Sequence, residues 1–392
     1  MRTRLLALIL LVAVGSAGAA GGASRQVVTG GLVAPTAFAF LPDGRVLVAE
    51  HRGVVRVVAG GRLLAAPLVD IRARVNAFNE RGLLDVAADP GFARNGYVYL
   101  YYAYEHDRSE PAGAKSMRVT RVRVRGNRAV PGSETVVLGT VAGDCNAVPR
   151  GSDCIPANCG CHTGGEVAFA ADGTLFLSTG DGARGGRANT NALRSQDLDS
   201  LAGKLLRVDR SGRGLRTNPY FTGRARDNRS KVWALGLRNP FRFDLDPASG
   251  VPVVGDVGWR AWEEIDAAPA GANLGWPCYE GAGRQPAYAA AEVCRRLYRR
   301  GAEGVRAPIH AYPRPRTGAS VIGGAFRGDA YVFADYVRGW VREARVRNGR
   351  FAAEPATLAT AARGIVDLEV GPDGAVYYLV LAAGELRRLR NG

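Results

Sequence analysis

The sequence predicts an all-β protein, a six-bladed β-propeller of four-stranded antiparallel blades. The first observation is a repeated unit of a short alternating strand, a tight turn with Asp-Gly or Pro, and another strand. The second is that six imperfect copies spread over roughly 360 residues, about 60 for each blade. A pair of β-sandwiches is the alternative. The even spread of the hairpins and the absence of a linker favour one closed ring.

The hairpins follow one another along the whole chain, and long amphipathic helices are hard to find between them. Typical copies are FAFLPDGRVLVAE and VAFAADGTLFLSTGD, and the copy that begins at Ala325 is degenerate. The six copies begin at Phe38, Asp85, Val167, Phe241, Ala325 and Leu368.

The N-terminal residues 1–20 have the features of a secretory signal peptide. Arg2 and Arg4 precede an apolar run over residues 5–14, and small residues follow at 17–19. The run is too short to span a membrane, which takes about 20 apolar residues. We therefore expect an exported protein, periplasmic or extracellular, with residues 23–392 as a single propeller domain and no transmembrane segment.

The composition of the chain limits the classes of partner that it is expected to bind. The chain has 392 residues, is 47% hydrophobic and 22% charged, and carries a formal net charge of +16. Its arginines are scattered, with no basic tail and no basic helix interleaved with aromatic residues, which disfavours nucleic-acid binding. A basic surface is compatible with attraction to anionic cell surfaces or acidic glycans.

Six cysteines in an exported chain predict disulfides. Cys278 and Cys294 are expected to close one loop. The other four crowd into an insertion at about residues 143–161 and are expected to pair among themselves, with connectivity left open. They are Cys145, Cys154, Cys159 and Cys161.

The cysteine-rich insertion ends at a histidine, which leaves two alternatives open. A Cys/His metal site is one, although Cys159, Cys161 and His162 lack the usual two-residue spacer of zinc sites. A c-type haem is disfavoured, because Asn158 stands where its C-x-x-C-H motif needs a cysteine.

One hairpin places a histidine opposite an aspartate. In an antiparallel hairpin the position numbers of paired residues have a constant sum, about 344 for a turn centred on Asp172. His162 and Asp181 add to 343, so they should face each other at the open end of this hairpin. A carboxylate that fixes the tautomer of an imidazole prepares it as a general base. A capping histidine satisfied by a neighbouring carboxylate is the alternative.

Seven motifs, in order along nearly all of the mature chain, resemble the soluble sugar dehydrogenases that use pyrroloquinoline quinone (PQQ), the glucose/sorbosone dehydrogenase family with its bacterial aldose sugar dehydrogenases. The resemblance implies a six-bladed propeller with PQQ on its top face. Four of the seven motifs are ERGLLDVAADPGF, HTGGEVAFAADGTLFLSTGD, VWALGLRNPFRFD and GDVGWRAWEEID. The seven begin at Glu80, His162, Gln196, Val232, Gly255, Gly271 and Gly323.

Matching positions carry roles from this family. His162 falls on the catalytic histidine and Asp181 on the aspartate that orients it. Arg238 and Asn239 match the pair that contacts the reactive carbonyl side of the quinone, with Arg238 also stabilising charge there. A blade-locking role is the alternative for Arg238.

Five further positions complete the implied cofactor site. Gly258 and Trp259 match residues whose backbone carbonyls hold a calcium ion, and calcium prefers oxygen ligands. Arg327 and Arg338 fall near positions where basic side chains bind the carboxylates of PQQ, and Glu80 falls at the cofactor edge. The alternatives are solvated surface charges for the two arginines and a bulge at Gly258.

The resemblance implies hydride transfer from C1 of an aldose to PQQ, which yields a lactone, with His162 taking the hydroxyl proton and calcium polarising the quinone. The external electron acceptor is not identified by the sequence. A non-catalytic propeller that binds a protein or glycan is one alternative, because animal relatives resemble a hedgehog-binding module. A calcium-dependent lactonase is another, but it would need converging carboxylates that the sequence does not identify.

Overall fold

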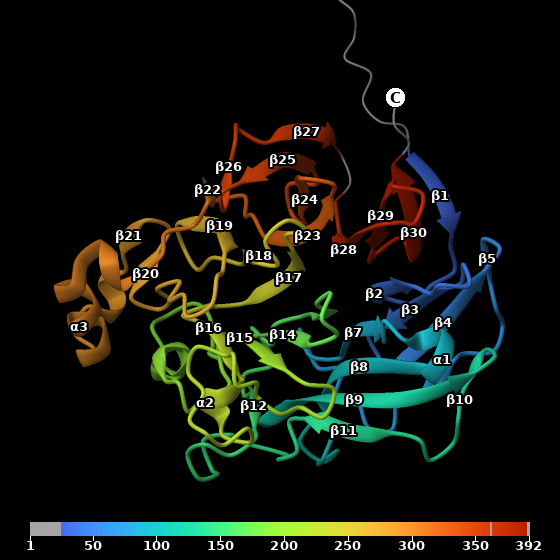
Figure 1. Cartoon of the computed structure of the whole chain (residues 1–392), viewed down its shortest axis with the longest axis horizontal. Helices are drawn as coiled ribbons and strands as arrows, with labels where there is room; N and C mark the ends of the chain where they lie inside the picture. Colours follow the sequence, from blue (N-terminus) through green and yellow to red (C-terminus); the bar gives the residue numbers. More distant parts are fainter. Residues whose placement is uncertain (1–24, 361–362, 390–392) are drawn as a thin grey trace, which may run out of the picture.

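The protein is described by a computed structural model that covers residues 25–360 and 363–389, so the predicted signal peptide lies outside the described residues. Six antiparallel sheets stand around a central axis, which confirms the predicted six-bladed propeller (Figure 1). In the hairpin around Asp172, Val167 pairs with Leu177 and Phe169 with Leu175, the register that the sequence predicted. No helix of the described residues is long and apolar enough to cross a membrane.

The first three sheets hold the blue, cyan and green parts of the chain (Figure 1). The first contains β2 (Pro35–Phe40), β3 (Val46–Glu50), β4 (Val54–Ala59), β5 (Arg62–Leu63) and β6 (Val69–Asp70). The second contains β7 (Leu83–Ala88), β8 (Tyr97–Tyr104), β9 (Lys115–Arg125), β10 (Arg128–Ala129), β11 (Thr135–Leu138) and β12 (Ile155–Ala157). The third contains β13 (Val167–Phe169), β14 (Leu175–Thr179), β15 (Lys204–Val208) and β16 (Val232–Leu235).

The last three sheets complete the ring. The fourth contains β17 (Pro240–Leu245), β18 (Pro252–Asp256), β19 (Trp262–Ala267) and β22 (His310–Pro313). The fifth contains β23 (Val321–Arg327), β24 (Ala330–Asp335), β25 (Val341–Arg347), β26 (Arg350–Phe351) and β27 (Ala356–Ala359). The sixth joins β28 (Ile365–Val370), β29 (Val376–Val380) and β30 (Glu385–Leu389) to the N-terminal β1 (Arg25–Thr29), so both ends of the chain close one blade.

The remaining elements are short and lie in loops between the strands. They are α1 (Phe92–Asn95), α2 (Asn228–Lys231), α3 (Glu292–Arg300), the pair β20 (Tyr279–Glu280) and β21 (Gly283–Arg284), and 3-10 turns at Thr190–Gln196, Pro286–Tyr288 and Gly301–Gly304. The helix α3 projects from the ring beside β20 and β21 (Figure 1).

Apolar side chains fill the space between each pair of neighbouring blades, in six clusters around the ring. Carboxylates on the innermost strands add direct links, because each accepts a backbone N–H of the next blade. Asp85 accepts from Val167 at 2.7 Å, and Asp367 on β28 accepts from Phe38 at 2.8 Å. Neighbouring inner strands are therefore joined by hydrogen bonds as well as by packing.

Five of the six inner strands share one irregularity near their start, and β13 does not. A β-bulge occurs at Thr36, Leu84, Phe241, Ile322 and Val366. One buried guanidinium contacts the backbone at three of these positions: Arg242 donates to the carbonyls of Thr36, Leu84 and Val366. It also donates to Gly165 O and pairs with Asp367 at 2.9 Å. A single side chain on β17 thus joins four other blades at the axis.

Arg242→Met should destabilise the fold strongly. The change leaves several buried carbonyls and the buried carboxylate of Asp367 without their partner, and breaking a buried ion pair typically costs about 3–5 kcal/mol. Denaturant unfolding followed by circular dichroism measures the loss. The matched control is Arg345→Met, whose side chain is 65% exposed and pairs with Asp329 across 3.7 Å, so about 1 kcal/mol or less is expected. Equal effects of the two changes would contradict the role given to Arg242.

Candidate active site

A cavity of about 370 Å³ opens on the axis at the end of the ring where the inner strands begin. Its floor contains all five bulge residues, and its walls include His162, Arg238, Asn239, Glu80 and Arg314. A larger open groove of about 970 Å³ lies along β9 of the second blade and is lined by none of the predicted site residues. The axial cavity is therefore the place where the predicted chemistry converges.

The predicted contact between His162 and Asp181 is present. Nδ1 of His162 lies 2.9 Å from Oδ1 of Asp181, and both side chains are buried. The loop before β13 holds the histidine with a φ of 51°, a left-handed conformation that is uncommon for a residue with a side chain. Its backbone N–H donates to Glu80 Oε2 at 2.8 Å, and its carbonyl accepts from Gly182 at 3.1 Å. These bonds fix the direction of the imidazole.

The partners of the imidazole determine its tautomer. Asp181 is fully buried, and burial alone would raise its pKa, but attraction to a protonated His162, the hydrogen bond with that ring, the charge of Arg238 and the N–H of Ala183 outweigh burial and hold the pKa below its usual value. An ionised carboxylate only accepts, so Nδ1 of His162 carries the proton. In the neutral ring Nε2 is then an acceptor, and Arg238 Nη2 lies 2.6 Å from it. The basic nitrogen is therefore the one that Arg238 contacts at the cavity.

Trp276, which the sequence patterns do not single out, also holds the aspartate. Trp276 Nε1 donates to Asp181 Oδ2 at 2.8 Å, and the backbone of Ala183 donates to Oδ1 at 2.8 Å. Trp276 belongs to the motif that begins at Gly271, far from Asp181 in the sequence. The only sequence feature that points to it is its place inside a motif shared with the family. With these bonds both oxygens of Asp181 are held in place.

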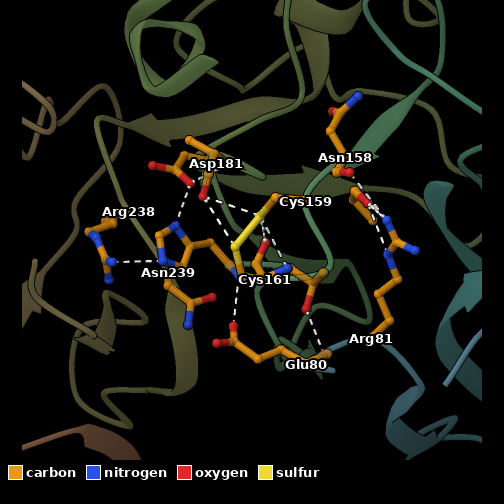
Figure 2. Close-up of a disulfide and its surroundings, with 12 residues drawn as sticks. Glu80, Arg81, Asn158, Cys159, Cys161, Asp181, Arg238 and Asn239 are labelled. Carbon is orange, nitrogen blue, oxygen red and sulfur yellow. Dashed lines mark hydrogen bonds and ion pairs between the residues drawn. A yellow bond between two sulfur atoms is a disulfide. The ribbon is translucent and has the colours of Figure 1, made fainter. Parts of the chain in front are cut away.

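Arg238 and Asn239 lie side by side between β16 and β17 (Figure 2). Their backbone N–H groups donate to the buried carboxylate of Asp256 at 2.8 and 2.7 Å. Burial raises the pKa of Asp256 to about 7. Arg238 Nη1 donates to Val257 O at 2.7 Å, whereas its Nε is buried without a hydrogen-bond partner among the described residues. Nε of Arg238 is therefore a donor that no described residue uses.

Of the other residues predicted to bind the cofactor, one lines the cavity and two do not. Glu80 lines it beside His162. Arg327 does not, because it lies at the opposite end of β23 from the cavity and pairs with Glu343. Arg338 also stays outside the lining, donating to Pro313 O at 2.6 Å with its guanidinium over the ring of Tyr312.

The two residues predicted to bind calcium have other contacts. The carbonyl of Gly258 accepts from Arg314 Nη1 at 2.8 Å, and Trp259 is buried against Trp276 and Tyr288. A calcium ion on this carbonyl would stand beside a guanidinium of like charge, so the residues present fit the ion poorly. Nor does any group of three or more His, Cys, Asp or Glu in the described part of the chain form a metal-binding cluster. The sequence does not predict a role for Arg314, because no motif sets it apart from the many other arginines of the chain.

All six cysteines form disulfides. Cys278 pairs with Cys294 as predicted, and the other four pair among themselves as Cys145–Cys154 and Cys159–Cys161. The thiolates of a Cys/His metal site are therefore not available, and that alternative is wrong. Figure 2 shows Cys159–Cys161 next to Glu80, Asp181, Arg238 and Asn239.

The fold and the cavity define a propeller with a buried histidine–aspartate pair on its axis. Residues 32–388 match the family described as glucose/sorbosone dehydrogenase, and the chain belongs to this family. A solved structure, a putative oxidoreductase (glucose dehydrogenase) from Thermus thermophilus, superposes with a TM-score of 0.73 and 28% identity, over 94% of this chain and 100% of that one.

Curated relatives match shorter parts. The aldose sugar dehydrogenase YliI of Escherichia coli is 30% identical over 62% of this chain and 58% of its own length. Quinoprotein glucose dehydrogenase B of Acinetobacter calcoaceticus is 25% identical over 64% of this chain and 52% of its own length. The chain therefore spans less than two thirds of these relatives.

The tautomer of His162 is open to a direct test. Its ¹⁵N resonances should show a protonated Nδ1 and an unprotonated Nε2 in the neutral ring, because Asp181 accepts only from a donor. In Asp181→Asn this preference should weaken, since an amide can turn either its oxygen or its NH₂ group to the ring. The exposed His106 is the internal control. Protonated Nε2 in the neutral unsubstituted protein would contradict the assignment.

Proposed function

We propose that this protein oxidises aldose sugars at C1 to lactones by passing a hydride to PQQ bound in the axial cavity. The observation that carries the proposal is His162, which is held at Nδ1 by a buried carboxylate and turns Nε2 toward the cavity beside Arg238. This is the arrangement that a general base needs for a hydroxyl proton. The family and the named dehydrogenase relatives support the reaction class.

The lining of the cavity fits a planar anionic quinone. About 370 Å³ is within the range of small-molecule sites, and the walls carry the cations Arg238 and Arg314. The unpartnered Nε of Arg238 adds a buried donor. When bound, PQQ would supply the hydride acceptor, which no side chain can provide.

The protein's own residues would perform the proton chemistry. Nε2 of His162 would take the C1 hydroxyl proton, which requires Arg238 to yield or share that nitrogen. Asp181, kept ionised and held by Trp276, would stabilise the imidazolium that forms. Arg238 would then face negative charge that develops on the acceptor, the kind of fixed electrostatic support that lowers a barrier.

Calcium at Gly258 and Trp259 remains a prediction of the family resemblance, and the contacts of Arg314 argue against it. The roles predicted for Arg327 and Arg338 also remain predictions, to be tested by substitution, and the positions of both side chains outside the lining do not support them.

Export and the identity of the acceptor belong to the proposal as well. Three disulfides are typical of a protein that matures in an oxidising compartment, which supports export to the periplasm or beyond. The substrate would be a small sugar. Neither the sequence nor the site indicates the identity of the external electron acceptor.

Two other functions have weaker support. A propeller that only binds a protein or glycan has no evident use for a base held by a buried carboxylate. A calcium-dependent lactonase needs carboxylates that converge on the cavity, whereas Asp181 and Asp256 are occupied by His162, Trp276 and backbone N–H groups.

His162→Ala should lower sugar turnover by about 10²–10⁴-fold while quinone affinity changes little, because the imidazole acts mainly in the transition state. Steady-state turnover with an artificial electron acceptor, measured beside a PQQ titration, separates the two effects. Arg238→Ala should instead weaken both turnover and quinone binding, since it faces the ligand in the ground state.

The control for these variants is His106→Ala, which removes an exposed histidine outside the cavity and should leave both quantities unchanged. Unaltered turnover in His162→Ala would show that the base is wrong. A parent protein that neither oxidises sugars nor binds the quinone would favour the binding-module function.

A further inference from the structure

A second arginine faces the cavity in a fixed position. Arg314 follows β22, and its backbone N–H donates to Ala261 O at 2.8 Å. Nη1 of its guanidinium donates to Gly258 O at 2.8 Å and pairs with Glu263 Oε1 at 2.8 Å. The Glu263 side chain is fully buried, so this ion pair anchors the guanidinium from the protein side.

The partner carboxylate has further bonds. Glu263 Oε2 accepts the backbone N–H of Val321 at 3.0 Å and that of Gly258 at 3.3 Å. Moving Arg314 away would leave a buried carboxylate with backbone donors alone. Arg314, in the loop between β22 and β23, is therefore held firmly against the loop between β18 and β19, although 29% of its side chain is exposed and it lines the cavity.

Two consecutive carbonyls in this loop are each covered by an arginine. Val257 O accepts from Arg238 and Gly258 O from Arg314, at 2.7 and 2.8 Å. Calcium sites need several oxygens directed at one point with no cation among them. On this side of the cavity the positive charge comes from the guanidinium groups of Arg238 and Arg314.

We propose that Arg314 takes the place of a metal ion in this site, so that the protein binds an anionic o-quinone through Arg238 and Arg314 without a divalent cation. The inference rests on the proposed function. A guanidinium is permanently charged and presents a planar fork of N–H donors, which suits carboxylate and carbonyl oxygens on a flat ligand. Because Glu263 and Gly258 hold it, the charge is in place before the ligand arrives.

The test is a PQQ titration of chelator-treated protein, with and without added calcium, followed by the absorbance of the quinone. Unsubstituted protein should bind with an affinity that calcium changes by less than about threefold. Arg314→Gln keeps a polar side chain but loses the charge. It should bind at least about tenfold more weakly without calcium, and added calcium should recover part of the loss, because the Gly258 carbonyl and Glu263 become open to a metal.

Terbium luminescence sensitised by tryptophan reports metal binding independently of activity. Arg314→Gln should bind the lanthanide more tightly than the parent does. Arg314→Lys restores the charge and should bind the quinone without metal, though more weakly than arginine. The matched control is Arg316→Gln, an exposed arginine two residues along the same loop, which should match the parent. Thermal unfolding of each variant checks that the fold is kept.

Two results separate the possible failures. Quinone binding by the parent that requires calcium, together with terbium affinity equal in the parent and Arg314→Gln, would overturn the role of Arg314 alone. The absence of quinone binding in every variant, with and without calcium, would overturn the proposed function itself.

Discussion

The structure depends on the contacts of one guanidinium with the backbone at the axis. Each blade alone offers a sheet whose inner edge would leave polar groups unpaired, and such groups are costly to bury. The bulges at the start of the inner strands allow carbonyls of Thr36, Leu84 and Val366 to reach the axis, where Arg242 donates to all three. Its charge is compensated by Asp367 and neighbouring buried acids. Asp85, the partner of the Val167 N–H, feels the same burial, which raises its pKa to about 7.

The same feature shapes the site. The bulged residues form the floor of the cavity, so the strands that Arg242 holds together also bound the site. The functional side chains come from loops that leave this frame: His162 before β13, Asp181 after β14, and Arg238 before β17. Since Glu166 of the third blade accepts the N–H of Phe243 in the fourth, the distance between His162 and Arg238 is set by how these two blades pack.

Arginine is abundant in this protein, and three arginines have defined roles in its structure. Arg242 joins blades at the axis, Arg238 covers Val257 O and Nε2 of His162, and Arg314 covers Gly258 O. In each case a guanidinium donates to backbone carbonyls that a bulge or a loop leaves unpaired. Two of these arginines, Arg238 and Arg314, line the cavity.

The sequence by itself determined the six blades, the register of the hairpin around Asp172, the contact of His162 with Asp181 and the loop closed by Cys278 and Cys294. These features follow from alternation, turn chemistry and short separations, which are local properties of a chain. The partners from distant segments were decided by tertiary structure: Trp276 on Asp181, Arg314 on Gly258, and the placing of Arg327 away from the cavity. An arginine has the same charge and length wherever it stands in the sequence. Only the closing of the ring decides which carbonyl or carboxylate lies within its reach.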